Sequence, residues 1–171
     1  MNKSEEVFKK SLFFYKYSSD LKSKTDSSIK IELFKPTVMR LNSHTEKLLI
    51  YIFWYLVTLG KYTIYYVKND DDKIIHYSHV LPKFFKFPFM KKGDLEIGPC
   101  WTHENFRGRE IYPNVLKYII NSNFRMNRSF YMMIDHKNIA SQKGTEKVGF
   151  TLFAKGYKTK WLGIYRPIEI I

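Results

Sequence analysis

Cysteine is almost absent from this chain of 171 residues, which contains only Cys100. A single cysteine excludes a disulfide within the chain and is compatible with a reducing compartment. Long hydrophobic runs are also missing, since the longest, Leu48 to Leu59, is too short to cross a bilayer as a helix. The first residues lack the basic-then-apolar order of a secretory signal peptide. We therefore expect a cytoplasmic protein without a membrane span.

Acidic residues are scarce. Sixteen Asp and Glu stand against 29 Lys and Arg, which leaves a net charge of +13. This excess predicts a polyanionic partner, and nucleic acid, an anionic membrane surface, a nucleotide sugar and coenzyme A all qualify. No nucleic-acid-binding motif accompanies the charge, so we expect no nucleic acid as a partner.

The remaining composition is that of a folded chain, with 44% hydrophobic and 18% aromatic residues. The length predicts one domain over residues 1–171, in which residues 1–28 form a poorly defined N-terminal segment. The segment 9–17 fits either a strand or a helical turn. A capping box at 43–46 predicts a helix that Gly60 ends.

Hydrophobic periodicity predicts further helices near 112–124 and from Asn138 onward. It also predicts strands at 29–34, 61–68, 73–80, 94–103, 129–135, 150–155 and 160–166. The strands at 61–68 and 73–80 form a hairpin across an Asn-Asp turn. This order of elements predicts a mixed α/β fold.

The segment Thr102 to Tyr112 runs from a strand end through a small, basic turn into an amphipathic helix. Such a turn presents free backbone N–H groups and a positive helix end to an anion. The same pattern also fits a basic surface turn without a ligand. A second segment, Asn138 to Phe150, combines a short helix closed by glycine with a following strand.

Both segments, in this order and at this separation, resemble the Gcn5-related N-acetyltransferase (GNAT) superfamily over about residues 94–156. An asparagine stands eleven residues before a Gly-Phe pair, Gly149-Phe150, as in the family. The resemblance implies a mostly antiparallel central sheet flanked by helices, and an acyl-CoA-dependent N-acyltransferase. It also implies acetyl-CoA or another acyl-CoA as co-substrate, and no metal.

The resemblance places the pyrophosphate turn on the six residues 107–112, of which Arg107, Gly108 and Arg109 fit the family pattern. Glu110 stands where glycine is usual, and Tyr112 stands where a small residue is usual. A carboxylate near a pyrophosphate would repel it unless the side chain points away. The cofactor-binding residues implied in this way are Trp101, Thr102, His103, Arg107, Gly108, Arg109, Glu110, Ile111, Tyr112, Asn138 and Ser141. In the first three, main-chain N–H groups would meet the acyl carbonyl.

A general base is expected on the strand at 94–103, where alternation puts Asp94, Glu96, Gly98, Cys100 and Thr102 on one face. Glu96 lies eleven residues before the turn, at the position of the glutamate base in histone-acetylating relatives. Half-burial would raise the pKa of this carboxyl and suit it to accept a proton. The alternative is a solvated or ion-paired glutamate.

Two histidines compete with Glu96 for this role. His76 and His79 are three residues apart on a strand, so they point to opposite faces and at most one can face a substrate. His79 is retained as a catalytic candidate, against the simpler interpretation of a structural histidine. Their spacing does not suit a metal site.

The general acid is the open question of the site. The family's tyrosine acid corresponds to Thr145, which is a poor proton donor. Water, Cys100 or Tyr157 would then protonate the leaving thiolate. Cys100 also fits the simpler interpretation of a buried strand cysteine.

The acceptor is expected to be an amine. The segment Lys83 to Lys92 interleaves aromatic rings with lysines, and most of these rings are expected in the core, with one or two facing the acceptor. The stretch 97–102 resembles GNAT members of bacterial surface-polysaccharide pathways, which implies an amino sugar on a nucleotide carrier. Alternatives are a catalytically degenerate GNAT fold, a basic polyanion- or nucleic-acid-binding protein, and a peripheral membrane protein. Either a monomer or a homodimer is compatible with the sequence.

Overall fold

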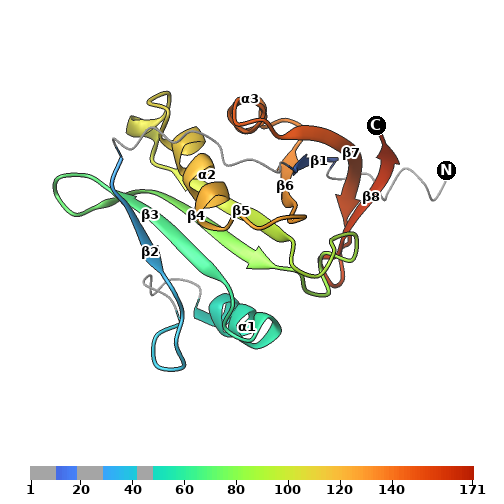
Figure 1. Cartoon of the computed structure of the whole chain (residues 1–171), viewed down its shortest axis with the longest axis horizontal. Helices are drawn as coiled ribbons and strands as arrows, with labels where there is room; N and C mark the ends of the chain where they lie inside the picture. Colours follow the sequence, from blue (N-terminus) through green and yellow to red (C-terminus); the bar gives the residue numbers. More distant parts are fainter. Residues whose placement is uncertain (1–10, 19–28, 42–47) are drawn as a thin grey trace.

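A computed structural model describes residues 11–18, 29–41 and 48–171. Within them, eight strands form one sheet in the order β2-β3-β4-β5-β6-β1-β7-β8 (Figure 1). The neighbours are antiparallel except for β5 and β6, which run parallel. The strands are β1 (Leu12–Tyr17), β2 (Ile31–Phe34), β3 (Thr63–Lys68), β4 (Ile74–Pro82), β5 (Leu95–Thr102), β6 (Phe130–Asp135), β7 (Thr151–Lys158) and β8 (Tyr165–Ile170).

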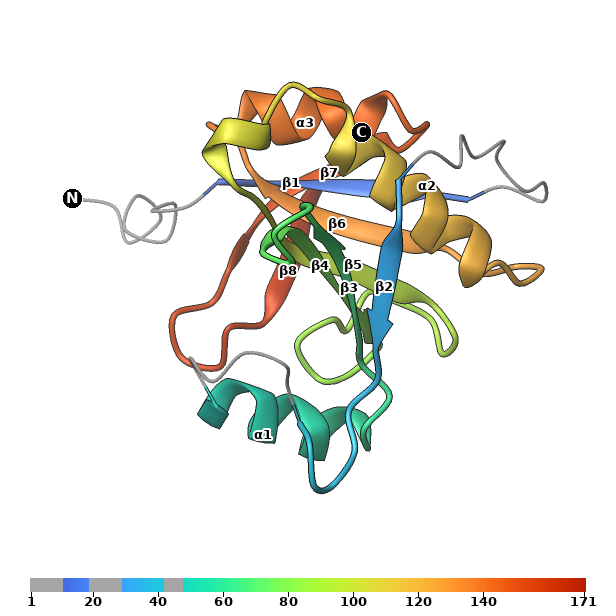
Figure 2. The same cartoon turned by 90° about the vertical axis from the view of Figure 1, so that its left-hand side faces the viewer.

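Helices cover both faces of this sheet. In the described residues these are α1 (Leu48–Thr58), α2 (Ile111–Ser122) and α3 (Ile139–Glu146), and a 3-10 turn, η1, spans Glu104–Phe106. The helices α2 and α3 lie on one side of the sheet and α1 lies on the other (Figure 2). None of the helices described is long and apolar enough to cross a membrane. The predicted mixed α/β class with a mostly antiparallel sheet is confirmed.

The two helical layers rest on two separate hydrophobic clusters. The apolar stripe of α2 is fully buried, and it packs with β-sheet residues such as Ile97 and Met132. On the other face, Tyr51 of α1 packs with Tyr62, Phe84 and Phe87. The aromatic segment 83–92 therefore contributes mainly to the core, as expected. Burying such large side chains is the main stabilising term of each layer.

The segment that fitted either a strand or a helical turn is a strand. β1 lies between β6 and β7, and Phe14 and Tyr15 are both buried because each face of this strand is covered. Aromatic residues on adjacent positions suit such a doubly buried strand. The capping box predicted at 43–46 and most of the segment 1–28 lie outside the described residues.

The last predicted strand, 160–166, is wrong in its position. β7 continues to Lys158, a turn covers 159–164, and β8 begins only at Tyr165. Thr159 N donates to Ile164 O at 2.9 Å, and Gly163 adopts φ +62°, a conformation that glycine tolerates. Residues 160–164, whose aromatic and apolar side chains favour a strand, therefore lie in the turn.

Strand β5 changes face near its middle. Val80 pairs with Ile97, but Ser78 pairs with Cys100, so the register against β4 shifts by one residue between them. Such a bulge reverses the alternation of side chains beyond it. Glu96 therefore faces the α1 side, whereas Cys100 faces the α2 side with Ser78. The prediction that these residues share one face is wrong for this reason.

Candidate active site

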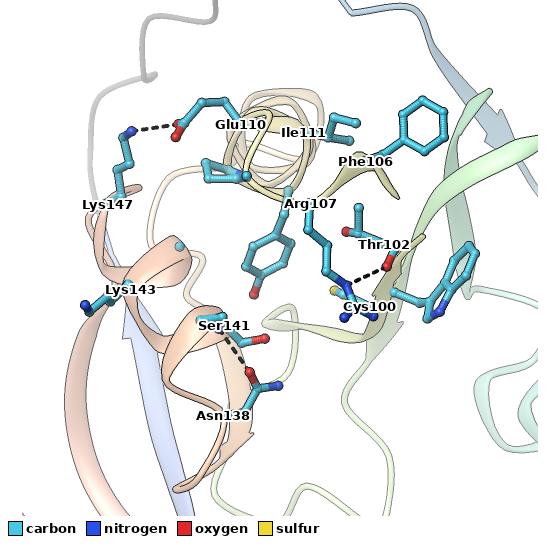
Figure 3. Close-up of a pocket in the computed structure, with 16 residues that line it drawn as sticks. Cys100, Thr102, Phe106, Arg107, Glu110, Ile111, Asn138, Ser141, Lys143 and Lys147 are labelled. Carbon is cyan, nitrogen blue, oxygen red and sulfur yellow. Dashed lines mark hydrogen bonds and ion pairs between the residues drawn. The ribbon is translucent and has the colours of Figure 1, made fainter. Parts of the chain in front are cut away.

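Two cavities lie against strand β5, one on each side of the sheet. The first has a volume of about 610 Å³ and lies between the N-terminal end of α2 and helix α3 (Figure 3). The second, of about 520 Å³, lies under α1. Parallel pairing of β5 with β6 is limited to Leu95 with Phe130 and Glu96 with Tyr131, so the two strands separate where the cavities approach each other.

Nine of the predicted cofactor-binding residues line the first cavity. They are Trp101, Thr102, Arg107, Gly108, Glu110, Ile111, Tyr112, Asn138 and Ser141. Lys143 and Lys147 of the α3 region also line it, and sequence reasoning missed them because an exposed helical lysine is a common surface feature. His103 and Arg109 lie outside the lining. Arg109 instead places its guanidinium over the Phe106 ring, 5.1 Å from the centroid.

The turn before α2 is a cradle of unused backbone donors. In the described part of the chain, no hydrogen bond uses the N–H groups of residues 108–112. Gly108 has φ +75°, and a Cβ placed there would meet no atom within 4 Å. The turn is thus open toward solvent and ends at the positive pole of α2. This geometry suits an anion.

Glu110 turns its carboxylate away from this cradle. Its backbone adopts φ 60°, and its Oε2 pairs with Lys147 Nζ at 2.7 Å (Figure 3). Glu110 thus adopts a left-handed conformation that glycine would reach with less strain. Because the ammonium of Lys147 neutralises it, this carboxylate does not oppose an anion in the turn.

The backbone N–H groups of β5 divide between two directions. His103 N donates to Ile75 O at 2.8 Å, which fixes the hydrogen-bonded positions of the β4–β5 ladder. Because an antiparallel ladder alternates, Trp101 N–H also faces β4, whereas Cys100 and Thr102 N–H face the gap toward β6. The prediction that Trp101 and His103 offer N–H groups to an acyl carbonyl is therefore wrong. Thr102 keeps that position, and Cys100 joins it.

Side chains at the edge of the first cavity are held by local bonds. Arg107 Nε donates to Thr102 O at 3.1 Å, which ties the turn to the end of β5. Asn138 caps helix α3, since its Oδ1 accepts from Ser141 N at 3.1 Å. Ser141 itself lines the cavity on the first turn of α3.

Thr145 is fully buried and does not line the cavity. Its Oγ1 shares a hydrogen bond of 2.8 Å with the hydroxyl of Tyr112, a residue that does line the cavity. The Tyr112 ring fits because residue 144 is glycine: a Cβ there would lie 2.7 Å from the ring. A tyrosine from α2 thus brings its hydroxyl beside the residue that stands where the family's tyrosine is expected. Sequence reasoning treated Tyr112 and Thr145 as unrelated departures.

Polar side chains next to Tyr112 are neutral at pH 7. His76 is buried and bonds Thr102 Oγ1 at 2.8 Å and Ser78 Oγ at 2.9 Å. Burial lowers the pKa of His76 to about 4. Ser78 donates to Cys100 Sγ at 3.1 Å, and burial raises the pKa of this thiol to about 12. Cys100 is therefore not a ready thiolate nucleophile.

His79 points to the opposite face from His76, as predicted, and lies outside the lining of both cavities. Its Nδ1 bonds Pro99 O at 2.9 Å, and its Nε2 bonds Tyr51 Oη at 3.1 Å. These contacts tie α1 to the bulged part of β5. In the described residues, no three His, Cys, Asp or Glu side chains gather as a metal ion would require.

Glu96 lines the second cavity, where only 6% of its surface is exposed. Its Oε2 is buried and has no hydrogen-bond partner in the described structure. Burial raises the pKa of this carboxyl well above its ordinary value, and nearby Lys158 opposes part of that shift. A buried carboxyl that is not tied to a structural partner is the form that proton transfer requires.

The fold of this chain is similar to that of several solved structures. The chain aligns over 86% of its length with an acetyltransferase of the GNAT family from Colwellia psychrerythraea, at a TM-score of 0.59 and 13% identity. This is the fold of the Gcn5-related N-acetyltransferases. A GCN5-related N-acetyltransferase from Sphaerobacter thermophilus aligns over 85% of the chain, at a TM-score of 0.58 and 14% identity. A GNAT-family protein from Novosphingobium aromaticivorans aligns over 85% of the chain, at a TM-score of 0.58 and 11% identity.

The similarity is structural, and it spans only part of these proteins. The chain covers 54%, 49% and 61% of the Colwellia, Sphaerobacter and Novosphingobium chains, respectively. No protein-family model matches the sequence, and no curated protein is a significant sequence relative. The GNAT fold predicted from the two segments is confirmed, while the activity is a matter for proposal.

The contact between Tyr112 and Gly144 yields a prediction about stability. Gly144→Ala should lower the free energy of unfolding by about 1–3 kcal/mol because the added Cβ overlaps the ring. In a Tyr112→Ala background, the same change should instead stabilise by up to about 1 kcal/mol, because alanine favours a helix over glycine. Urea unfolding of the four variants measures this coupling. Equal effects in both backgrounds would contradict the contact.

Proposed function

We propose that this protein is an acyltransferase that moves an acetyl or related acyl group from an acyl-CoA to an amine. The supporting observation is the position of β5. Its separated end borders a cavity with free backbone N–H groups on one side, and a cavity with the buried Glu96 carboxyl on the other. We further propose that residues 1–171 act as a single catalytic domain.

The first cavity fits a coenzyme A pyrophosphate. The N–H groups of residues 108–112 would bind its oxygens, and Arg107 and Lys143 would supply positive charge around them. Ser141 offers a hydroxyl on the opposite wall. When bound, the acyl-CoA supplies the thioester carbonyl that the amine attacks. The outward direction of Glu110 removes the main objection to this fit.

The chain's own groups can then account for the protons. Cys100 and Thr102 N–H would donate to the carbonyl oxygen as negative charge develops on it. Glu96 would accept a proton from the amine, directly or through water, as the new C–N bond forms. The C–S bond breaks and the sulfur takes up a proton. Starting from an ammonium form, the acceptor loses two protons, one to the sulfur and one to solvent.

Tyr112 is our candidate for the proton donor to sulfur. Tyr112 lines the first cavity, and its hydrogen bond to Thr145 fixes the phenol in one orientation. Burial raises its pKa, so the proton remains on the phenol at neutral pH. Thr145 is then a positioning residue.

Gly108→Asp should abolish binding of acetyl-CoA to the protein. The new carboxylate would lie at the opening of the turn and repel the pyrophosphate, as well as straining a backbone at φ +75°. Gly93→Asp is a matched control, because Gly93 has φ +101°, is equally open and lies outside the cavity. Calorimetry with acetyl-CoA, and with ATP for comparison, measures both. Retained binding by Gly108→Asp would refute the pyrophosphate site.

Glu96→Gln should lower turnover at pH 7 by about 10²–10⁴-fold while leaving acetyl-CoA affinity nearly unchanged. The amide keeps the size of the side chain but cannot accept the proton. Glu104→Gln, an exposed change next to the turn, serves as the control. An unchanged rate in Glu96→Gln would rule out this base.

The pH profile offers an independent check of the same group. Glu96 can act as a base only when ionised, and its pKa is raised, so kcat/KM should increase with pH well above the ordinary carboxyl range near about 4.3. This rise should disappear from any residual activity of Glu96→Gln. A profile with its acid limb at an ordinary carboxyl pKa would contradict the buried base.

Tyr112→Phe should lower kcat by about 10²-fold or more while the ring, and therefore the packing on Gly144, remains. Acetyl-CoA affinity should change little. Thr145→Val, which removes the hydrogen bond but keeps the phenol, should have a smaller effect. If Tyr112→Phe is as active as the wild type, water becomes the donor.

A further inference from the structure

The cavity beneath α1 is the second of the two that lie against β5, and its walls are mostly apolar. Its volume of about 520 Å³ exceeds that of a small amine and falls within the usual range for ligand pockets, about 300–1,000 Å³. The apolar lining comes from α1, β4, the segment 83–92 and β6: Leu49, Ile50, Phe53, Trp54, Leu81, Phe84, Phe87 and Met133. A hydrophobic ligand body suits these walls.

Three charged side chains interrupt this apolar lining. Glu96 contributes a carboxyl whose Oε2 is buried and unpartnered. Lys86 and Lys158 also line the cavity, and neither forms an ion pair with a carboxylate in the described residues. Leaving a buried polar atom without a partner is unfavourable, so such atoms point to a missing partner.

The two lysines are held close to each other. A Cβ placed on Gly163 would lie 3.0 Å from Lys158 Cε and 3.7 Å from Lys86 Nζ, so this glycine leaves room for both side chains. Lys86 Nζ lies over the Phe53 ring at 4.8 Å, and Lys158 Nζ over the Tyr165 ring at 5.1 Å. Two neighbouring ammonium groups that line one cavity, neither of them in an ion pair in the described residues, attract an anion.

The backbone fixes this arrangement from two sides. Tyr165 N donates to Lys86 O at 2.9 Å, which joins the segment 83–92 to the start of β8. Phe87 stacks on Tyr165, with ring centroids 5.4 Å apart. Lys158 and Tyr165 lie on opposite sides of the β7–β8 turn and form a register pair. These contacts join the segment that carries Lys86 to the β7–β8 hairpin that carries Lys158.

We infer that this cavity binds a free hydrophobic α-amino acid: its amine would lie at Glu96, its carboxylate at Lys86 and Lys158, and its side chain among the aromatic rings. The inference rests on the proposed acyl transfer, and makes that amine the acceptor. An amino acid carries its two opposite charges close together, as the carboxyl and the ammonium groups of the cavity also lie close enough to interact. Both sets of charges would then be paired.

Other small amines fit the cavity less completely. An arylalkyl amine without an acid group would leave Lys86 and Lys158 unpaired. A nucleotide-linked amino sugar, the acceptor suggested by sequence, would place sugar hydroxyls against aromatic walls that offer them few hydrogen bonds. These compounds therefore form the comparison arms of the test.

The test is calorimetric titration of the full chain with L-phenylalanine, phenethylamine, 3-phenylpropionate and UDP-glucosamine, each with and without saturating CoA. L-Phenylalanine should bind at least about tenfold more tightly than phenethylamine or 3-phenylpropionate, since each analogue lacks one charge-assisted set of bonds. Equal affinities, tighter UDP-glucosamine binding, or no binding of L-phenylalanine in either condition would overturn the inference.

A lysine variant tests the contact with the ligand carboxylate separately from the contact with its amine. Lys158→Met should weaken L-phenylalanine about tenfold and leave phenethylamine unchanged. Lys160→Met, an exposed change outside the cavity, should alter neither. An equal loss for both ligands in Lys158→Met would mean that the lysine acts on folding and not on the carboxylate, which contradicts the proposed contact.

Loss of the acceptor site and loss of acyl transfer give different experimental results. Acetyl-CoA binding without L-phenylalanine binding would refute the acceptor and leave acyl transfer standing. L-Phenylalanine binding without acetyl-CoA binding would refute acyl transfer and leave an amino-acid site. Transfer of the acetyl group to L-phenylalanine, detected by mass spectrometry, would support both.

Discussion

The separation of β5 from β6 is the constraint on which the proposed site depends. Parallel pairing stops after Glu96, and the register against β4 shifts between Val80 and Ser78. From that point, the outer N–H groups of β5 have no strand partner on their β6 side, and side chains that would share one face turn to opposite faces. Had the two strands stayed paired, the N–H groups of Cys100 and Thr102 would be bonded to β6. One local break in the sheet thus creates both the free donors and the access to them.

What could be predicted from sequence was mainly what is local in the chain. The turn at 107–112 and the start of a helix at Asn138 are short patterns whose conformation depends on neighbouring residues, and both segments contribute residues to the cavity lining. The succession of strands β3 to β7 along the chain followed from periodicity in the same way. The face of Glu96 relative to Cys100 depends on a bulge, and a bulge is a property of two strands. Periodicity along one strand cannot reveal it, and the same limit applies to the direction of the His103 N–H.

The most informative departures from the family pattern are linked in space. A tyrosine at 112 and a threonine at 145 each weakened the resemblance when considered alone. In the structure their hydroxyls are 2.8 Å apart, and Gly144 provides the space for the ring. A glycine inside α3 is otherwise unfavourable for a helix, by about 1 kcal/mol relative to alanine. Three residues that are separately unfavourable or atypical are therefore mutually consistent in space.

The charged side chains beneath α1 are also unfavourable when each is considered alone. Glu96 is buried without a partner, and burial together with Lys158 lowers the pKa of Lys86. Each of these features lowers the stability of the free protein, and a direct Glu96–Lys158 ion pair would remove part of that loss. In the described residues, the Glu96 carboxyl forms no ion pair with either ammonium group, although all three side chains line the same cavity. Such an arrangement is unfavourable in the free protein and would be satisfied by a ligand with opposite charges at a similar separation. A pre-organised binding site requires both properties. A cavity that served only packing would not need any of the three charges.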